Sequence, residues 1–373
     1  MKVLIYTDPH IAANRTANTT PKSRARLKAA LLAKTKQILS SAAALTCDRS
    51  VCVGDFFDTY RNDQADVLAA LKPFMGTDYI LAGNHDLLAH ADSISSLVFL
   101  DQMAKQLPLD ENEPRPEVIY GKLGETHVKQ VNLQDAVLLF IPHVYTQALF
   151  ERSLDEAAVI ASTLAGEQPA LSVYLFLHCN VDSGFAEGSD IALNLTTERA
   201  KAMLEAGVTR IFCGHEHEPR DLLQTRLMIL GNTHPTSFAD MGSKRFVVLD
   251  TATGEVDEHW TYSADRHYFA VDWGGFDLNH PHPFGPEAVE EAAHWIRLTG
   301  TANASQVVDL AKLVRKLWDT CPNLMGLKVD VKIADLQLDP SAGQVSVADL
   351  KELVTRELQS QPDLLELWKE IAA

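Results

Sequence analysis

Apolar residues along the first two thirds of the chain recur in two patterns. Short β-branched and aromatic runs predict strands over residues 2–6, 50–53, 79–82, 117–120, 127–131, 136–141, 172–177, 209–213, 227–230, 245–250 and 256–262. Apolar positions at helical spacing predict helices over residues 22–45, 63–74, 93–106, 146–165 and 197–206. Strands that alternate with helices and then give way to β-rich segments predict an α/β fold with more than one sheet.

The pattern changes near residue 265. Residues 272–286 are rich in glycine and proline, which is typical of a linker or of an irregular entry to a second unit. Beyond it, helices are predicted over 287–298, 304–318, 347–359 and 362–372, and a strand over 327–333. A length of 373 residues also favours one large domain and a smaller one. We therefore predict a first domain over 1–265 and a smaller C-terminal α/β domain over 266–373.

Apolar content and cysteine usage narrow the class of protein. The chain is 46% hydrophobic but contains no apolar run of about 18 residues, so no membrane-spanning helix is expected. The N-terminus enters a strand by residue 3, without the features of a signal peptide. The five cysteines are scattered and mostly lie inside apolar runs. They are expected to be buried thiols in a reducing cytoplasm and not a disulfide or zinc framework.

The net charge of −17 argues against a protein that holds a nucleic-acid backbone by itself. The richest basic cluster lies in the early helix and comprises Lys22, Arg24, Arg26, Lys28, Lys34 and Lys36. A solvated helix face and a phosphate-facing surface are both compatible with this pattern. If the substrate is a nucleic acid, metal ions and a partner protein are expected to supply much of the attraction.

Five predicted strands end in residues that bind metals or transfer protons. The stretches that follow them are Asp8-Pro9-His10, Gly54-Asp55-Phe56-Phe57-Asp58, Gly83-Asn84-His85-Asp86, His178 and Gly214-His215-Glu216-His217. Open α/β sheets place their active sites at such strand ends. Carboxylate, amide and imidazole ligands without cysteine suit Mn²⁺, Fe²⁺ or Zn²⁺, and an open mixed shell favours manganese. Two such ions are what phosphoester hydrolysis requires, since together they neutralise the phosphate and activate water.

In order and context, these five motifs resemble the signatures of the calcineurin-like metallophosphoesterase superfamily over residues 1–265. The resemblance implies a four-layer α/β/β/α sandwich with a dinuclear metal centre. It implies one metal held by Asp8, His10, Asp55 and His217, and a second held by Asp55, Asn84, His178 and His215. It gives His85 the role of protonating the leaving-group oxygen or of stabilising the transition state. Asp86 is expected to orient His85 or its loop. Asp58 is expected to support the ligands, with direct ligation as the alternative.

Two details narrow the branch of the superfamily. Asp58-Thr59-Tyr60 stands where phospho-Ser/Thr phosphatases have Asp-Arg-Gly. Residues 231–240, together with the Gly54–Asp58 motif, resemble segments of SbcD-type nucleases and their phage-encoded counterparts, although Thr233-His234 replaces the usual proline. This resemblance implies a manganese-dependent DNA exo- or endonuclease in DNA repair or recombination. It also implies an SMC-like ATPase partner and a C-terminal capping or DNA-binding domain.

The sequence is compatible with other functions and with other roles for several residues. A small-substrate nucleotide phosphodiesterase or phosphatase fits an acidic chain, and a non-catalytic metal-binding scaffold would have lost a ligand or His85. His143 is expected to be a hydrogen-bonded strand-end histidine, with an approach to the site as the alternative. His234 is a candidate for phosphate contact, whereas Tyr60 and Arg61 are expected on a loop surface. Helix 93–106 is a candidate homodimer interface, although burial in the monomer explains its apolar residues equally well.

Overall fold

The computed structural model describes residues 1–13, 21–87, 95–107, 115–121, 125–183, 193–263, 268–275, 294–303, 306–321 and 323–333, and residues 355, 359 and 365. The chain forms two compact units. The first comprises residues 1–15, 28–236 and 242–263, and the second comprises residues 16–27, 237–241 and 264–373. The second unit therefore takes in two short segments that the predicted two-domain division assigns to the first.

The first unit contains two six-stranded mixed sheets. One has the order β14-β13-β1-β2-β3-β4. Its strands are β1 (Lys2–Tyr6), β2 (Arg49–Cys52), β3 (Tyr79–Leu81), β4 (Glu117–Ile119), β13 (Lys244–Asp250) and β14 (Val256–Tyr262). Strands β1 to β4 are mutually parallel, and β13 and β14 join the edge of the sheet in antiparallel fashion.

The other sheet has the order β11-β12-β10-β7-β6-β5. Its strands are β5 (Lys129–Asn132), β6 (Ala136–Ile141), β7 (Ser172–His178), β10 (Arg210–Gly214), β11 (Arg220–Leu222) and β12 (Leu227–Ile229). Its four central strands, β6, β7, β10 and β12, are parallel, and β6 and β7 are almost continuously buried. Uninterrupted apolar runs are typical of parallel strands covered on both faces.

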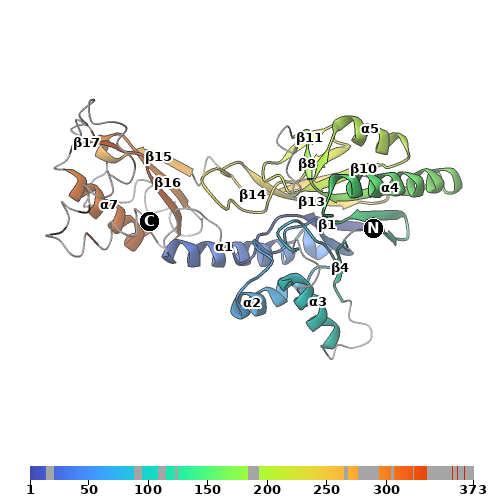
Figure 1. The fold of residues 1–373 in the computed structure, drawn as a ribbon, viewed down its shortest axis with the longest axis horizontal. Coiled ribbons are helices and arrows are strands. Elements are labelled where there is room, and N and C mark those ends of the chain that lie inside the picture. The colour runs from blue at the N-terminus through green and yellow to red at the C-terminus, as the bar shows by residue number, and fades with distance from the viewer. Residues whose placement is uncertain are drawn as a thin grey trace. The chain divides into compact units, whose positions relative to one another are not determined.

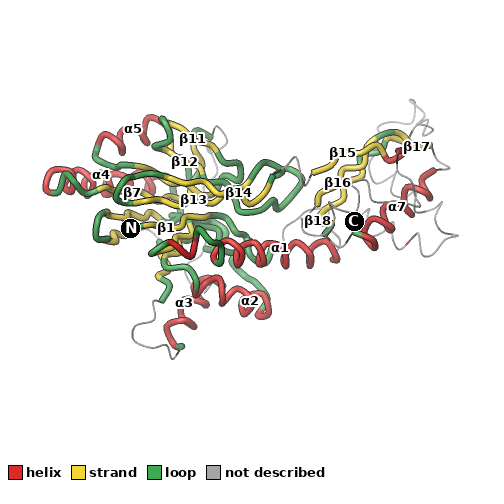
Figure 2. The backbone as a smooth tube through the Cα atoms, turned by 180° about the vertical axis from the view of Figure 1, so that it is seen from behind, coloured by secondary structure: helices red, strands yellow, loops and turns green. Residues whose placement is uncertain are grey.

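Three apolar clusters divide this unit into four layers. One cluster lies between the sheets and joins Val3 and Ile5 of β1 to Phe140 and Phe176 of the other sheet. The outer cluster of the first sheet includes residues of α1 (Pro21–Leu39), α2 (Gln64–Met75) and α3 (Ser96–Gln106). That of the second sheet includes residues of α4 (Gln147–Glu167) and α5 (Thr197–Glu205). Figures 1 and 2 show α2 and α3 on the opposite side of the sheets from α4 and α5. The predicted α/β/β/α layering is confirmed.

Local capping explains where three of these helices begin. The side chains of Ser95, Thr146 and Thr196 accept hydrogen bonds from backbone N–H groups in the first turns of α3, α4 and α5. Such caps satisfy donors that have no partner within the helix. Short elements complete the unit: a 3-10 turn over Ala44–Thr46 and the two-residue strands β8 (Asn180–Val181) and β9 (Asn194–Leu195).

The second unit has a smaller core of its own. Strands β15 (Tyr268–Asp272), β16 (His294–Thr299) and β18 (Leu324–Val329) form a parallel sheet beside α7 (Val307–Thr320). A 3-10 turn (Trp273–Gly275) and the paired strands β17 (Thr301–Ala302) and β19 (Lys332–Ile333) lie nearby in the sequence. The predicted helix over 287–298 is wrong from residue 294 onward, because β16 is a strand. The predicted helices over 347–359 and 362–372 lie almost entirely outside the described residues.

The basic cluster of α1 is partly used for internal contacts. Within the second unit, the Arg26 guanidinium donates hydrogen bonds to the carbonyls of Trp318, Cys321 and Leu324 at the end of α7. Within the first unit, Lys28 pairs with Asp66 at 2.6 Å and Lys34 donates to the Thr261 carbonyl. These three side chains therefore have structural partners, which reduces the basic surface that α1 can offer to a phosphate backbone.

Two further expectations concern the membrane and the cysteines. Among the described residues, no helix is both long enough and apolar enough to cross a bilayer. All five cysteines are free thiols, and four of them are buried, as their apolar surroundings in the sequence predicted.

Candidate dinuclear metal centre

The polar motifs lie at the carboxyl ends of parallel strands. Asp8 and His10 follow β1, Asp55 and Asp58 follow β2, Asn84, His85 and Asp86 follow β3, His178 ends β7, and His215 and His217 follow β10. Parallel pairing of β1 with β2, of β2 with β3, and of β7 with β10 brings these ends to one edge of each sheet. The structure therefore brings together all of the site residues that the sequence predicted.

The backbone at these strand ends is strained. Asp8, His10 and Asp55 have φ angles of 49°, 43° and 46°, and His215 has a φ angle of 89°. Residues other than glycine rarely adopt positive φ, and each such conformation costs about 1–3 kcal/mol. This conformation turns each side chain sharply off the end of its strand and toward the other motifs.

Two glycines leave room for the ligands. A Cβ atom on Gly54, whose φ is 105°, would lie 1.9 Å from Nδ1 of His178. A Cβ atom on Gly83 would lie 2.2 Å from Oδ1 of Asp55. Both distances are far shorter than any real contact. The carboxylate and imidazole ligands therefore pack directly on backbone that has no side chain.

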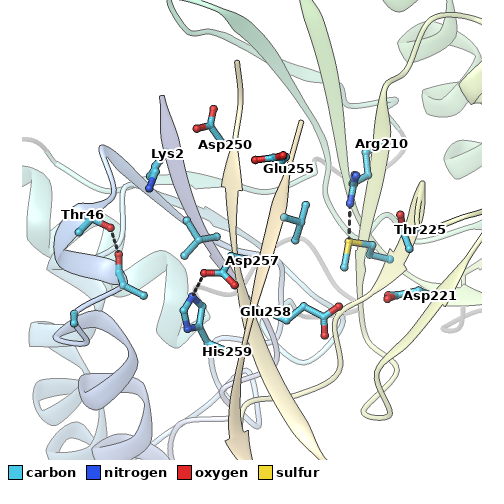
Figure 3. Close-up of a pocket in the computed structure, with 15 residues that line it drawn as sticks. Lys2, Thr46, Arg210, Asp221, Thr225, Asp250, Glu255, Asp257, Glu258 and His259 are labelled. Carbon is cyan, nitrogen blue, oxygen red and sulfur yellow. Dashed lines mark hydrogen bonds and ion pairs between the residues drawn. The ribbon is translucent and has the colours of Figure 1, made fainter. Parts of the chain in front are cut away.

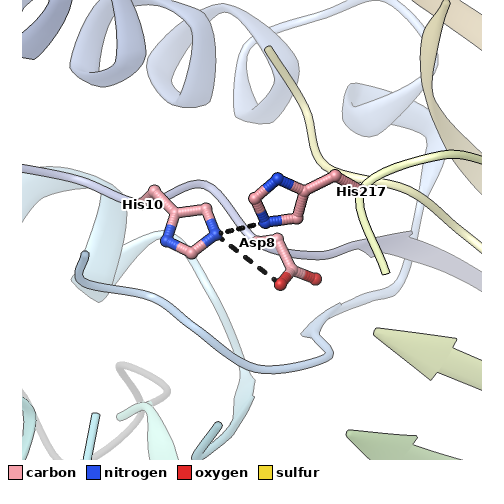
Figure 4. Close-up of side chains that lie close together, drawn as sticks. All are labelled: Asp8, His10 and His217. Carbon is pink, nitrogen blue, oxygen red and sulfur yellow. Dashed lines mark hydrogen bonds and ion pairs between the residues drawn. The ribbon is translucent and has the colours of Figure 1, made fainter. Parts of the chain in front are cut away.

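The first group of candidate ligands comprises Asp8, His10 and His217 (Figure 4). The Nε2 atoms of His10 and His217 are 2.9 Å apart, and Nε2 of His10 lies 3.7 Å from Oδ1 of Asp8. Oδ1 of Asp8 is buried and has no hydrogen-bond partner within the described chain. Two imidazole nitrogens and a buried carboxylate oxygen that converge in this way fit a divalent cation.

The second group comprises Asp55, His178 and His215, with Asn84 beside them. Nε2 of His178 lies 3.3 Å from Oδ2 of Asp55 and 3.1 Å from Oδ1 of Asn84. Nδ1 of His215 lies 2.9 Å from the same oxygen of Asn84. On its other side, His178 is held by Val53, whose carbonyl lies 2.9 Å from Nδ1. Nδ1 therefore donates to this carbonyl, and Nε2 points toward the carboxylate and the amide oxygen.

Electrostatics favour a cation in this centre. Burial raises the pKa of Asp8. Burial also opposes ionisation of Asp55, yet the His178 imidazole holds the pKa of Asp55 well below its ordinary value. Conversely, burial disfavours a proton on His178, but the charges of Asp55 and Asp8 raise its pKa to about 10. Burial and the charge of His178 lower the pKa of His215 to about 3. A potential that holds a proton on a fully buried imidazole also suits a divalent ion.

Asp58 contacts two histidines through different atoms. Its Oδ1 lies 3.5 Å from Nδ1 of His10, and its backbone carbonyl lies 2.6 Å from Nδ1 of His85. The three side chains are close enough to form a third candidate ligand group. His10, however, already directs Nε2 at Asp8 and His217, and a carboxylate beside the other ring nitrogen is the usual way to orient a metal-binding imidazole.

Asp86 stabilises the loops: in the described part of the chain its carboxylate bonds to backbone amides and not to the His85 ring. Its fully buried carboxylate accepts hydrogen bonds from the backbone N–H groups of Gly83, Phe56 and Phe57, at 3.0, 3.1 and 3.0 Å. Burial and the charge of Asp55 raise the pKa of Asp86 to about 7, while the three amides lower it. Of the two expected contacts, the structure contains the one with the loop: Asp86 ties the turn after β3 to the turn after β2.

The remaining histidine and loop predictions have mixed outcomes. His143 was expected to be a satisfied histidine, but its ring makes no hydrogen bond within the described chain. His234 is 2% exposed and its Nδ1 lies 2.8 Å from the Pro235 carbonyl, which leaves little surface for a phosphate. Arg61 lies over the ring of Tyr60 at 5.7 Å, on a partly exposed loop as predicted.

Three residues that stabilise the centre were missed in the sequence. The Thr7 hydroxyl lies within hydrogen-bonding distance of Oδ2 of Asp8 and of the Val53 carbonyl, and its one hydrogen can be donated to either. Glu216 accepts from the backbone N–H of Val181 at 2.6 Å, which fastens the segment after His178 to the last motif. Lys244 is fully buried and donates to the His217 carbonyl at 2.7 Å. In the sequence, the only sign of these three roles is a lysine, Lys244, within an otherwise apolar strand. That sign does not identify the His217 carbonyl as its partner.

A groove of about 800 Å³ lies away from the metal centre, beside β13 and β14 (Figure 3). Its charged lining comprises Lys2, Arg210, Asp221, Asp250, Glu255, Asp257 and Glu258. Arg210 is engaged there by Sδ of Met228 and by the Gly254 carbonyl. The excess of carboxylates makes this groove a poor site for a phosphate backbone.

Buried oxygen and imidazole ligands at the strand ends of two facing sheets define a dinuclear metal site of the kind that hydrolyses phosphoesters. The family model for calcineurin-like phosphoesterases matches residues 1–219, more than half of the chain. The chain belongs to this family. It is a metal-dependent phosphoesterase, and the two groups described above are its candidate ligands.

Solved structures with a related fold include a dimetal phosphatase from Danio rerio and a metallophosphoesterase from Sphaerobacter thermophilus. The match to the first has 12% sequence identity and a TM-score of 0.43, and it spans 69% of this chain and 95% of the solved chain. The match to the second has 13% sequence identity and a TM-score of 0.28, and it spans 70% of this chain and 89% of the solved chain. Similarities this low say nothing about the substrate of this chain. A search of the curated proteins found no match.

Metal binding is expected to release protons. In the metal-free centre the pKa of His178 is about 10, so near neutral pH its ring must lose a proton before Nε2 can bind an ion. Titration calorimetry with Mn²⁺ in buffers of different ionisation enthalpy will measure the release, expected to be at least one proton per chain. Asp55→Asn should abolish binding, whereas Asp257→Asn on β14 should not. A binding enthalpy that is independent of the buffer would contradict the prediction.

Gly83→Ala is expected to weaken metal binding by about 10–100-fold, because the new Cβ atom would displace the Asp55 carboxylate. Gly166→Ala in α4 is the matched control, since no atom lies within 4 Å of its added Cβ. That control should keep full metal affinity and gain about 0.5–1 kcal/mol of stability. Metal titration and thermal unfolding of both variants will check this. Equal metal affinities would show that the close approach at Gly83 is unimportant.

Proposed function

We propose that the chain is a manganese-dependent DNA exo- or endonuclease of the SbcD type, acting in the cytoplasm in DNA repair or recombination. The observation that carries this proposal is the position of residues 231–240, the segment that resembles those nucleases. The N–H of Asn232 bonds to the His217 carbonyl at 3.3 Å, so the segment begins against the last ligand motif. It continues into the second unit, where Phe238 packs against Trp295 at 5.1 Å.

In this proposal, Asp55 is shared between two ions. Asp8, His10 and His217 complete one ligand set, and Asn84, His178 and His215 complete the other. When bound, the ions neutralise a phosphodiester and lower the pKa of water, and oxygen-rich mixed ligands favour manganese. The second unit, which includes residues 266–373, would cap the site and help to select DNA.

His85 is the proposed proton donor. Its side chain is partly exposed, and its Nδ1 lies 2.6 Å from the Asp58 carbonyl. Donation from Nδ1 to this carbonyl leaves Nε2 directed away from it and available to the substrate. With a proton on each ring nitrogen, His85 would transfer the Nε2 proton to the leaving oxygen as its bond to phosphorus breaks, which leaves a neutral ring with its proton on Nδ1. Asp58 then acts as a positioning residue for His85 and His10, and Asp86 as one for the two loops.

Attraction of DNA requires more than this chain. The net charge is −17, and Arg26, Lys28 and Lys34 have internal partners. An SMC-like ATPase would provide the basic surface and ATP-driven access to DNA ends. The same observations favour a second candidate function, a phosphodiesterase or phosphatase of nucleotides, because a small substrate does not need an extended basic surface.

His85→Ala is expected to lower kcat by about 10²–10⁴-fold with metal content unchanged, because only proton transfer to the leaving oxygen is lost. Hydrolysis of labelled linear DNA and of bis-p-nitrophenyl phosphate will be measured with Mn²⁺, Mg²⁺ or chelator. His259→Ala on β14 is the control. Manganese-dependent DNA cleavage supports the nuclease. Hydrolysis of the small diester alone, even with the ATPase added, favours the nucleotide enzyme.

We also propose that α2 and α3 form a homodimer contact. Leu68 of α2 is 61% exposed and Phe99 of α3 is 46% exposed, beside a hollow of about 500 Å³ that Val67 and Met103 also line. Exposed apolar side chains around a hollow are typical of a protein contact. Part of the predicted helix over 93–106 thus faces solvent, and its other apolar residues, such as Leu97 and Leu100, are buried in the monomer.

The double variant Leu68→Glu with Phe99→Glu is expected to be monomeric under conditions where the wild type is a dimer, because carboxylates cannot be buried in an apolar contact. Sedimentation equilibrium will measure the mass of each. Val159→Glu is the control, since Val159 is 65% exposed on α4, outside the proposed contact. A monomeric wild type, or a double variant that still dimerises, would disprove this contact.

A further inference from the structure

His143 lies outside the five motifs but is fixed beside them. It follows β6 and Pro142, and its backbone N–H bonds to the Ala82 carbonyl at 3.0 Å. Ala82 immediately precedes the turn that carries Asn84. Gly121 also lies close, since a Cβ atom added to it would be 3.3 Å from the His143 carbonyl. The backbone of His143 is therefore tied to the segment that leads into the Asn84 turn.

The ring of His143 is buried without a partner. The residue is only 6% exposed, yet its ring makes no hydrogen bond within the described chain. The nitrogens of the ring are not among the fully buried polar atoms that lack a partner, so the edge of the ring is not completely enclosed. A polar atom that is open on one side of a largely buried side chain can hydrogen-bond to a ligand. The open nitrogen therefore suggests a ligand that arrives from solvent.

The charged groups around this ring belong to the metal centre. His143 interacts electrostatically with His178, Asp55 and His85, and it influences His215 in turn. An imidazole ring can present an N–H donor to an anionic oxygen at this place.

We propose that His143 is a substrate-contacting residue that donates its ring N–H to a phosphate oxygen, on the side of the centre formed by Asn84, His178 and His215. A hydrogen bond to an anionic oxygen is strong in a site from which water is largely excluded. The proposal rests on the phosphoesterase activity of this site but not on DNA as the substrate.

Inorganic phosphate is the probe, because it requires neither turnover nor knowledge of the natural substrate. Its affinity for the Mn²⁺-loaded protein is measured by calorimetry, after Mn²⁺ affinity has been measured for each variant. His143→Phe, which keeps the ring but removes the donor, is expected to weaken phosphate binding by about tenfold or more. His143→Gln, which retains an N–H donor, should recover part of the affinity. His259→Phe on β14 is the matched control and should change nothing.

Several outcomes would overturn the proposal. Unchanged phosphate affinity in His143→Phe would show that the ring does not contact phosphate. A parallel loss of Mn²⁺ affinity would assign His143 to the support of the metal ligands. Absence of phosphate binding by the Mn²⁺-loaded wild type would also refute it. Failure of DNA cleavage has no bearing on this measurement, so a wrong substrate class and a wrong role for His143 are distinguishable.

Discussion

The structure depends on a concentration of buried carboxylates at the ends of parallel strands. Asp8, Asp55 and Asp86 are at most 1% exposed. An ionised carboxylate is costly to bury unless charges or hydrogen bonds compensate for the lost water. Three backbone amides solvate Asp86, and His178 stabilises the charge of Asp55. These groups do not neutralise the carboxylates fully, and the negative potential that is left would be neutralised by a pair of divalent ions. The stability of this region and its chemistry therefore have the same physical origin.

The burial of two large apolar sheets compensates for the unfavourable backbone conformations in this centre. Positive φ angles at Asp8, His10 and Asp55 are unfavourable in isolation. They persist because each residue lies within four residues of the end of a strand whose side chains are buried between the sheets or beneath helices. Parallel pairing of β1, β2 and β3 fixes the separation of the turns, and Asp86 locks two of them together. The ligands are consequently placed by the cores of the sheets, although they belong to loops.

The sequence sufficed for the layering and for the side chains that lie together at the strand ends, because both follow from local patterns. Apolar runs marked the strands, and each ligand stands next to one in the sequence. It did not suffice where partners are distant or the pattern is ambiguous. Lys244 and the carbonyl it contacts are 27 residues apart, and Thr7 acts through Val53, 46 residues away. Residues 294–299 form a strand whose Trp295 and Ile296 are both buried, a short apolar run that a helix would present equally well.

The distribution of charge determines how a phosphate can reach the centre. The chain carries −17, and much of the basic face of α1 is bound to other parts of the protein. Positive charge toward a substrate is thus concentrated at the ions, whose field is screened over about 8 Å at physiological ionic strength. Long-range steering of a polyanion by this chain is therefore weak. Affinity must come from contacts made after arrival, through the ions and through hydrogen-bond donors beside them. In the proposed nuclease, a long nucleic acid would therefore be delivered by another protein, whereas in the alternative a nucleotide would diffuse in unaided.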